Sequence, residues 1–193
     1  MDVSKRFSDV GVIPVVVIED AADAVPTAKA LLAGGIDVME ITFRTAAARD
    51  AIAAVAKECP EMLVGAGTVL NMEQCLAALE AGANFIVAPG YSEEVVSYCV
   101  EHGVPMTPAC VTPTEIMAAL ELGITTVKFF PANVYGGLKA LKALAAPFPQ
   151  VRFIPTGGVD RSNIDEFLAF DKIAAIGGSF FVKEALEKME AQA

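Results

Sequence analysis

The stretch VPMTPACVTPTEIMAALELGITTVKFF, Val104–Phe130, reads as one complete unit of strand, helix and strand. Apolar and β-branched runs at its two ends predict strands over Val104–Thr107 and Thr125–Phe130. Between them, Thr112 is a predicted N-cap, followed by proline at the first helical position and by an acidic residue in the first turn. Gly123 follows the helical run, as glycines at helix C-termini do.

The same unit recurs along the chain, with Gly82, Gly103 and Gly123 spaced about one unit apart. Eight such units without an internal linker predict one α/β domain over residues 1–193, a (βα)₈ TIM barrel with a short C-terminal helix. The alternative is an open doubly wound sheet. Pro14 lacks an N–H inside the first strand, so we expect a bulge there. The predicted strands are Val12–Ile18, Asp37–Phe43, Met62–Val64, Phe85–Val87, Val104–Thr107, Thr125–Phe130, Val151–Ile154 and Ile173–Ile176. The predicted helices are Ala22–Ala33, Ala46–Glu58, Met72–Ala81, Glu93–Glu101, Pro113–Leu122, Gly137–Ala145, Arg161–Ala169 and Lys183–Gln192.

Composition excludes several classes of partner. The formal net charge of −10 argues against nucleic acid and anionic membranes, but it permits a small phosphorylated substrate. Apolar runs of strand length predict no membrane span. The single histidine, His102, argues against catalytic zinc, and we expect no metal and no cofactor. Four cysteines without a CxxC pair, and no signal-peptide pattern, predict free thiols and a cytoplasmic protein.

Three polar side chains share one face of the second predicted strand. Because side chains alternate along a strand, Glu40, Thr42 and Arg44 lie opposite the apolar residues that must meet the helices. Glu40 and Arg44 are therefore predicted to point into the mouth of the barrel, where such folds carry their chemistry. The alternative is a structural ion pair between these two residues.

Lys128 is flanked by Val127 and Phe129 in the sixth predicted strand. Burial in apolar surroundings lowers the pKa of a lysine and so favours the free amine. A free amine is the nucleophile that forms an imine with a ketone. Lys128 is therefore a candidate nucleophile; the alternative is an ammonium that pairs with Glu40 or reaches solvent.

Glycines follow three of the predicted strands. Gly65 and Gly67, before Thr68, allow backbone to approach a ligand closely, but their spacing is not that of a dinucleotide motif. Two further pairs, Gly157-Gly158 and Gly177-Gly178, fall after the seventh and eighth strands, where barrels of this type bind phosphate. The alternative is a pair of tight turns.

These features together resemble the 2-keto-3-deoxy-6-phosphogluconate (KDPG) aldolase family, which overlaps with 4-hydroxy-2-oxoglutarate (KHG) aldolase. The resemblance covers about Ile13 to Val182. It is carried by VMEITFRT at Val38–Thr45, VGAGTVLN at Val64–Asn71, VKFFPA at Val127–Ala132, RFIPTGGV at Arg152–Val159 and IGGS at Ile176–Ser179.

The resemblance implies a cytoplasmic, trimeric class I aldolase that cleaves KDPG, a substrate of the Entner-Doudoroff pathway, to pyruvate and glyceraldehyde 3-phosphate. It also implies cleavage of KHG to pyruvate and glyoxylate. Lys128 is the implied Schiff-base lysine, and Glu40 is the implied general acid and base. Arg44 and Thr68 are implied to hold the carboxylate of the keto acid, with Phe130 beside the pyruvate moiety. The implied contacts to the distal phosphate and hydroxyls are Thr156, Gly157, Gly158, Gly178 and Ser179.

The chain departs from the family pattern around the site. Ala109-Cys110-Val111 replaces a PGV-type segment, and Asn133 replaces an acidic residue. Few residues follow the eighth strand, so a short last helix is expected. Two alternatives remain at this point: another phosphate-binding barrel enzyme, or an assembly protein whose Ala-rich helices form subunit interfaces.

Overall fold

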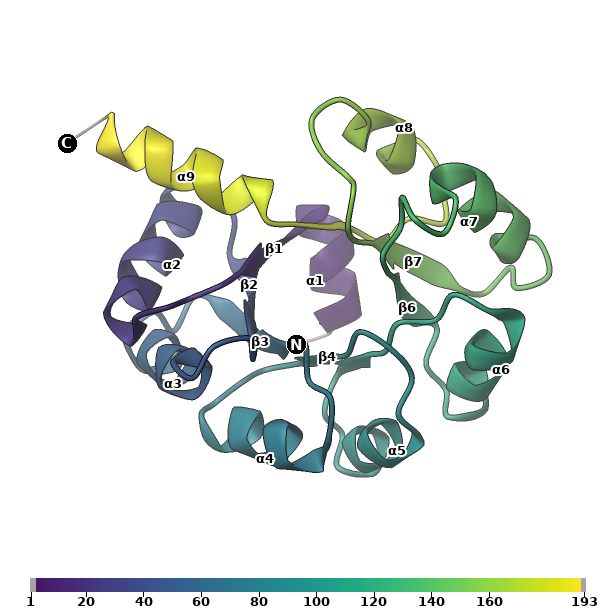
Figure 1. Cartoon of the computed structure of the whole chain (residues 1–193), viewed down its shortest axis with the longest axis horizontal. Helices are drawn as coiled ribbons and strands as arrows, with labels where there is room; N and C mark the ends of the chain where they lie inside the picture. Colours follow the sequence, from purple (N-terminus) through teal and green to yellow (C-terminus); the bar gives the residue numbers. More distant parts are fainter. Residues whose placement is uncertain (1–2, 192–193) are drawn as a thin grey trace.

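A computed structural model describes residues 3–191 of the chain; Gln192, the predicted end of the last helix, lies outside them. Strands and helices alternate along the chain, with α2 to α9 outside the strands and α1 across the middle (Figure 1). The strands are β1 Val12–Val16, β2 Val38–Thr42, β3 Leu63–Gly67, β4 Ile86–Val87, β5 Met106–Thr107, β6 Thr126–Phe129, β7 Arg152–Pro155 and β8 Ile176–Gly178. The helices are α1 Val3–Val10, the 3₁₀ turn η1 Ala21–Asp23, α2 Ala24–Ala33, α3 Ala48–Glu58, α4 Met72–Glu80, α5 Glu93–Glu101, α6 Pro113–Glu121, α7 Gly137–Ala145, α8 Ile164–Leu168 and α9 Phe180–Glu190.

The strands pair in parallel and in chain order. Six of them form one sheet in the order β5-β4-β3-β2-β1-β8, and β6 pairs with β7 in a second sheet. The first strand therefore pairs with the last, which an open doubly wound order does not produce. The prediction of a parallel α/β fold is confirmed, in the form of a parallel half-barrel sheet.

Isolated bridges connect the two sheets. Ala109, just after β5, bridges Lys128 on β6, while Thr156, just after β7, bridges Gly177 on β8. Phe153 on β7 also bridges Ile173, ahead of β8. The carboxyl ends of all eight strands therefore point to one side of the molecule.

Local signals in the sequence account for most element boundaries. Thr112 and Glu115 form the two-way capping box at the start of α6, and Ser92 caps α5. Gly82, Gly103 and Gly123 all have positive φ, between 67° and 97°, just after their helices. These predictions are confirmed.

Two strand boundaries were predicted wrongly because of glycine. The third strand was expected to end at Val64 but continues to Gly67. The eighth was expected at Ile173–Ile176, but Ile173 forms only an isolated bridge, and β8 begins at Ile176 and includes two glycines. Glycine weakens strand propensity, yet these positions are paired along their length with neighbouring strands.

Pro14 lies within β1, where a bulge was expected. β1 pairs with β8 at Val12, Ile13 and Pro14, and with β2 only from Val15 onward. The missing N–H therefore falls where the strand changes its pairing partner, and β1 runs through the proline.

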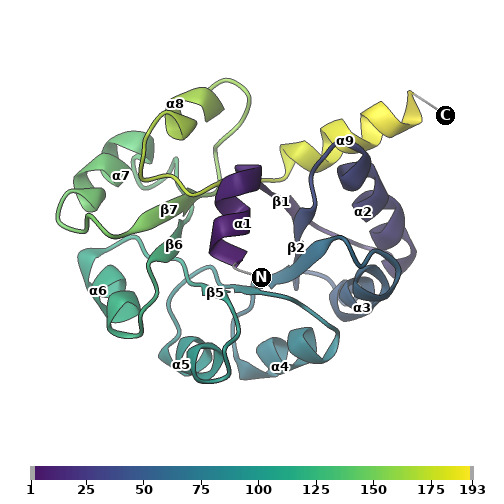
Figure 2. The same ribbon diagram turned by 180° about the vertical axis from the view of Figure 1, so that it is seen from behind.

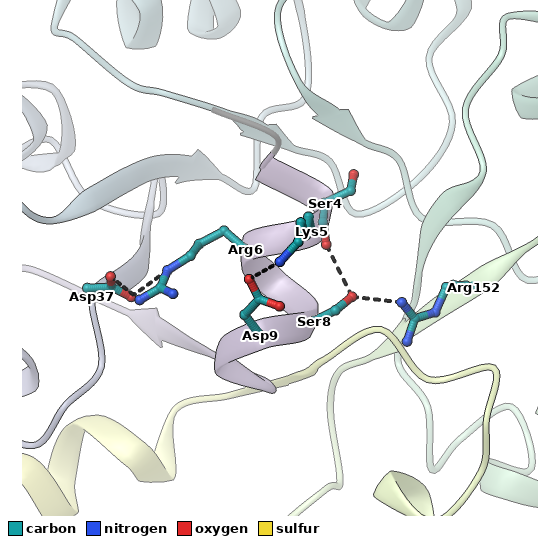
Figure 3. Close-up of polar contacts among 7 residues, drawn as sticks. All are labelled: Ser4, Lys5, Arg6, Ser8, Asp9, Asp37 and Arg152. Carbon is teal, nitrogen blue, oxygen red and sulfur yellow. Dashed lines mark hydrogen bonds and ion pairs between the residues drawn. The ribbon is translucent and has the colours of Figure 1, made fainter.

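Helix α1 was not predicted from the sequence, and it packs beneath the amino ends of the strands. Figure 2 shows it lying across the strands. Its Phe7 is 1% exposed and meets Phe85 edge-on, with ring centroids 4.9 Å apart. Polar contacts fix its outer face: Arg6 pairs with Asp37, and Arg152 donates a hydrogen bond to Ser8 at 2.8 Å (Figure 3).

The last helix was expected to be short, and this prediction is wrong. α9 spans 11 residues, as long as α3, because it begins at Phe180 directly after β8. The helix predicted over Arg161–Ala169 is shorter than expected and forms only at Ile164–Leu168. Asp160 accepts hydrogen bonds from the backbone and hydroxyl of Ser162, which holds the preceding residues in a turn.

The cysteines fill the core, as expected. All four are free and buried. Burial raises the pKa of the Cys99 and Cys110 thiols to about 12, so both remain protonated at neutral pH. Every helix within residues 3–191 is too short or too polar to cross a bilayer.

Candidate active site

A lysine and a glutamate that are far apart in the sequence lie close together on the inner faces of two strands. Lys128 on β6 and Glu40 on β2 are 5% and 3% exposed. Their Nζ and Oε1 atoms lie 3.4 Å apart, longer than the 2.7–2.9 Å usual for a charge-assisted hydrogen bond. The Phe130 ring centroid lies 5.4 Å from the same Nζ atom. The amine is thus enclosed, with one loosely held acidic partner.

Two glycines in β3 leave space that neighbouring side chains fill, and one of these side chains is Glu40. A Cβ atom on Gly67 would lie 1.8 Å from Glu40 Oε1, so the carboxylate occupies the space beside β3. Likewise, a Cβ on Gly65 would lie 2.2 Å from the Phe85 ring. These two glycines were expected to approach a ligand, but inside β3 they make room for protein side chains.

A cavity of about 440 Å³ opens at the carboxyl ends of β1, β7 and β8. Its lining unites seven of the ten predicted site residues, which come from four separate segments of the chain. They are Arg44, Phe130, Thr156, Gly157, Gly158, Gly178 and Ser179.

Lys128 and Glu40 line a smaller cavity, of about 10 Å³, which is otherwise lined by residues of neighbouring strands and by Phe7 of α1. Thr156 and Gly177 line both cavities. A Cβ on Gly177 would lie 2.1 Å from Thr156 Oγ1, so this glycine allows the Thr156 side chain to sit between the two spaces. Thr156 and Gly177 therefore form a wall shared by the open cavity and the small cavity that Lys128 lines.

Arg44 does not pair with Glu40 among the ion pairs of residues 3–191, so the proposed structural pair between them is wrong. Its guanidinium is exposed and faces the large cavity. Asp160 also lines this cavity. Hydrogen bonds from the Ser162 hydroxyl and backbone lower the pKa of Asp160, so the cavity carries one negative charge beside the positive charge of Arg44.

Thr68 is the predicted site residue that lines neither the large cavity nor the small one. It follows β3 with φ of 49°, in the left-handed region that a residue other than glycine rarely adopts. Such backbone strain is most common at binding and catalytic sites.

Three features of the candidate site were not predicted from the sequence. They are the space that Gly67 leaves for Glu40, the position of Gly177 between the two cavities, and the buried hydroxyl of Thr42. Thr42 is fully buried, and its Oγ1 atom has no hydrogen-bond partner among the described residues. The signal for Thr42 was present, since it lies between Glu40 and Arg44 on one strand face. Within residues 3–191, no group of three or more Asp, Glu, Cys or His side chains could hold a metal ion.

A parallel α/β fold with an enclosed amine and carboxylate below an open cavity has the parts of an enzyme active site, and the comparisons with known proteins give the class of that enzyme, aldehyde-lyase. The family model described as "Aldolase: KDPG and KHG aldolase" matches residues 3–193. The chain belongs to the KDPG and KHG aldolase family.

Similar proteins and a similar solved structure support this assignment to the family. A 2-dehydro-3-deoxy-phosphogluconate aldolase of Treponema pallidum is 52% identical over 90% of this chain and 82% of its own length. The KHG/KDPG aldolase of Escherichia coli K12 is 49% identical over 91% of this chain and 83% of its own. A crystal structure of KDPG aldolase from Legionella pneumophila, with pyruvate captured as a covalent carbinolamine intermediate, has a TM-score of 0.92 and 39% identity over 98% of this chain and 93% of that one.

Replacing Gly67 by Ala should leave the fold intact but lower kcat about 100-fold. The new Cβ would meet the flexible end of Glu40, which can move, and so displaces the carboxylate from Lys128. Steady-state kinetics and thermal unfolding test this. Gly90→Ala is the control, because a Cβ there meets nothing within 4 Å. Full activity of Gly67→Ala would show that the position of Glu40 is unimportant.

Proposed function

We propose that this protein is a class I aldolase that holds a 2-keto acid as a Schiff base on Lys128. The observation that carries the proposal is the buried Nζ atom of Lys128, 3.4 Å from Glu40 Oε1 and below an open cavity. An amine in this environment can react with a ketone, and the neighbouring carboxylate can move the protons that imine chemistry requires.

The proposed reaction uses one nucleophile and one acid–base group. Lys128 attacks C2 of the keto acid, and loss of water gives a protonated imine. Glu40 accepts the proton of the C4 hydroxyl, the C3–C4 bond breaks, and its electrons pass into the imine to form an enamine. Glu40 then protonates C3 of the enamine, and hydrolysis releases pyruvate and restores Lys128. No metal or organic cofactor takes part.

The substrate is proposed to be KDPG, with glyceraldehyde 3-phosphate as the second product; KHG, which gives glyoxylate, is proposed as a further substrate. The names of the relatives support both. Arg44 and Thr68 hold the carboxylate, since the guanidinium can bind a carboxylate through two parallel hydrogen bonds. Phe130 packs beside the pyruvate moiety.

The phosphate of the substrate is proposed to bind at the β7 and β8 end of the large cavity. Gly157 and Gly158 have φ of 86° and 77°, and turns that contain such left-handed backbone can present N–H groups to an anion. The helix α9 begins here, and its N-cap Ser179 makes no capping hydrogen bond with its side chain. Its hydroxyl is therefore available to a ligand, together with Thr156 and Gly178, which line the same cavity.

We also propose that the eight strands close into a single (βα)₈ barrel domain over residues 1–193. The bridges between β6 and the segment after β5, and between β7 and β8, support closure. The assembly is proposed to be a homotrimer; a subunit interface is supported by exposed apolar side chains after β6, such as Val134 and Tyr135, at 73% and 51% exposure. The four free thiols support a cytoplasmic location.

A cleavage assay with several substrates tests the proposed function. Pyruvate released from KDPG, KHG and a 2-keto acid without a C4 hydroxyl is measured with lactate dehydrogenase and NADH. We expect release from the first two but not from the third, and no loss of activity in EDTA. Absence of pyruvate from both KDPG and KHG would contradict the proposal.

Replacing Ser179 by Ala should raise KM for KDPG about tenfold while KM for KHG, which has no phosphate, stays unchanged. One lost hydrogen bond to a charged group accounts for the size of the effect. The two substrates control for each other within one variant. An equal change of KM for both would place the phosphate elsewhere.

A further inference from the structure

Thr42 carries a polar group that neither the fold nor the proposed reaction has so far used. Its side chain is 0% exposed, and its Oγ1 atom has no hydrogen-bond partner among the described residues. Leaving a hydroxyl buried and unpaired is unfavourable, so such a group in a native protein calls for an explanation.

The position of Thr42 relates it to Glu40. Both side chains lie on the inner face of β2, two residues apart. Thr42 pairs with Gly67 on β3, and the Glu40 carboxylate fills the space where a Gly67 side chain would be. Because neighbouring strands lie only about 4.8 Å apart, the hydroxyl and the carboxylate are neighbours at one level of the sheet.

The partner of Glu40 changes during the proposed reaction. In the structure, Oε1 accepts its hydrogen bond from Lys128 Nζ. Once Nζ is bonded to the substrate carbon, it has fewer protons to donate, and Glu40 must turn toward the C4 hydroxyl. The C4 hydroxyl then donates to one oxygen of the carboxylate, and the other oxygen is left buried without a donor, which is costly. A second donor close to Glu40 would remove that cost.

We propose that Thr42 is a positioning residue whose hydroxyl donates a hydrogen bond to the Glu40 carboxylate after Glu40 leaves Lys128. This inference rests on the proposed function. The hydroxyl is idle while Glu40 is paired with Lys128, and it orients the carboxylate for proton transfer during cleavage. A rotation about χ1 of Thr42, or of the flexible Glu40 side chain, brings the two groups together.

Two variants of the full chain test this role. Thr42→Val keeps the branched shape without the hydroxyl, and Thr42→Ser keeps the hydroxyl. Thr42→Val should keep or raise Tm, because an unpaired polar group is removed, and should still form a borohydride-reduced adduct with pyruvate. Its kcat for KDPG should fall about tenfold or more, as expected for a lost hydrogen bond to a charged group. Thr42→Ser should restore most of kcat.

Three results would overturn the inference. They are a kcat of Thr42→Val close to that of the wild type, a loss of kcat as large in Thr42→Ser, or a clear fall in Tm of Thr42→Val. The second would assign the effect to the methyl group, and the third would give the hydroxyl a role in the fold. If the wild-type protein itself forms no adduct, it is the proposed function that fails.

Discussion

Replacing Lys128 by Met is expected to reduce kcat/KM for KDPG to roughly 10⁻⁴ of the wild-type value or less. A loss of this size is typical when a covalent nucleophile is removed, because no other group can provide the imine that accepts electrons from the broken bond. The assay is pyruvate release, measured with lactate dehydrogenase. Lys139→Met is the matched control, since Lys139 is exposed on α7.

Stability must be separated from chemistry in this variant. Removing the Lys128 amine leaves the buried Glu40 carboxylate without its hydrogen-bond donor, so Lys128→Met should lower Tm. The double variant Lys128→Met with Glu40→Gln should recover part of that loss and remain inactive. Substantial activity in either variant would remove Lys128 from its proposed role.

Replacing Glu40 by Gln is expected to lower kcat by about 10²- to 10⁴-fold, the usual contribution of a positioned acid–base group. The amide cannot accept the proton of the C4 hydroxyl. The variant should still form the imine with pyruvate slowly, because the nucleophile is intact. Turnover and borohydride trapping measured on one preparation separate the two steps.

The control for this second variant is Glu61→Gln, an exposed glutamate just before β3. It should behave as the wild type in both measurements. Wild-type turnover by Glu40→Gln would show that another group moves the protons. Complete loss of the adduct would instead make Glu40 essential for imine formation itself.

The sequence predicted elements whose signals are local. Thr112, Glu115 and Gly123 fix the ends of α6 through contacts within a few residues, so they can be read without the rest of the fold. The polar positions of β2 and β6 were also readable, because a charged residue between apolar neighbours stands out in a strand. Lys128 and Glu40 were found in this way.

Features that depend on distant contacts could not be predicted. Gly65 and Gly67 look unfavourable for a strand until Phe85 and Glu40 are seen to fill the space beside them. Helix α1 is held by Phe7 against Phe85, a contact far apart in the sequence. The apolar spacing of Val3 and Phe7, which share one helix face, was its only local signal.

The unpaired state of Thr42 was likewise invisible in the sequence, since a threonine in a strand is ordinary. The alternation along β2 identified its face but not its partners. The gap of 3.4 Å between Lys128 and Glu40 is similar: the sequence predicted that the two could meet, and only coordinates give the distance.

The central claim is that Lys128 is the amine that bonds to the keto acid. The most direct measurement is to incubate the protein with pyruvate and borohydride and to locate the reduced adduct by peptide mass spectrometry. We predict a single adduct, on the peptide that contains Lys128. An adduct on another lysine, or none at all, would contradict the claim.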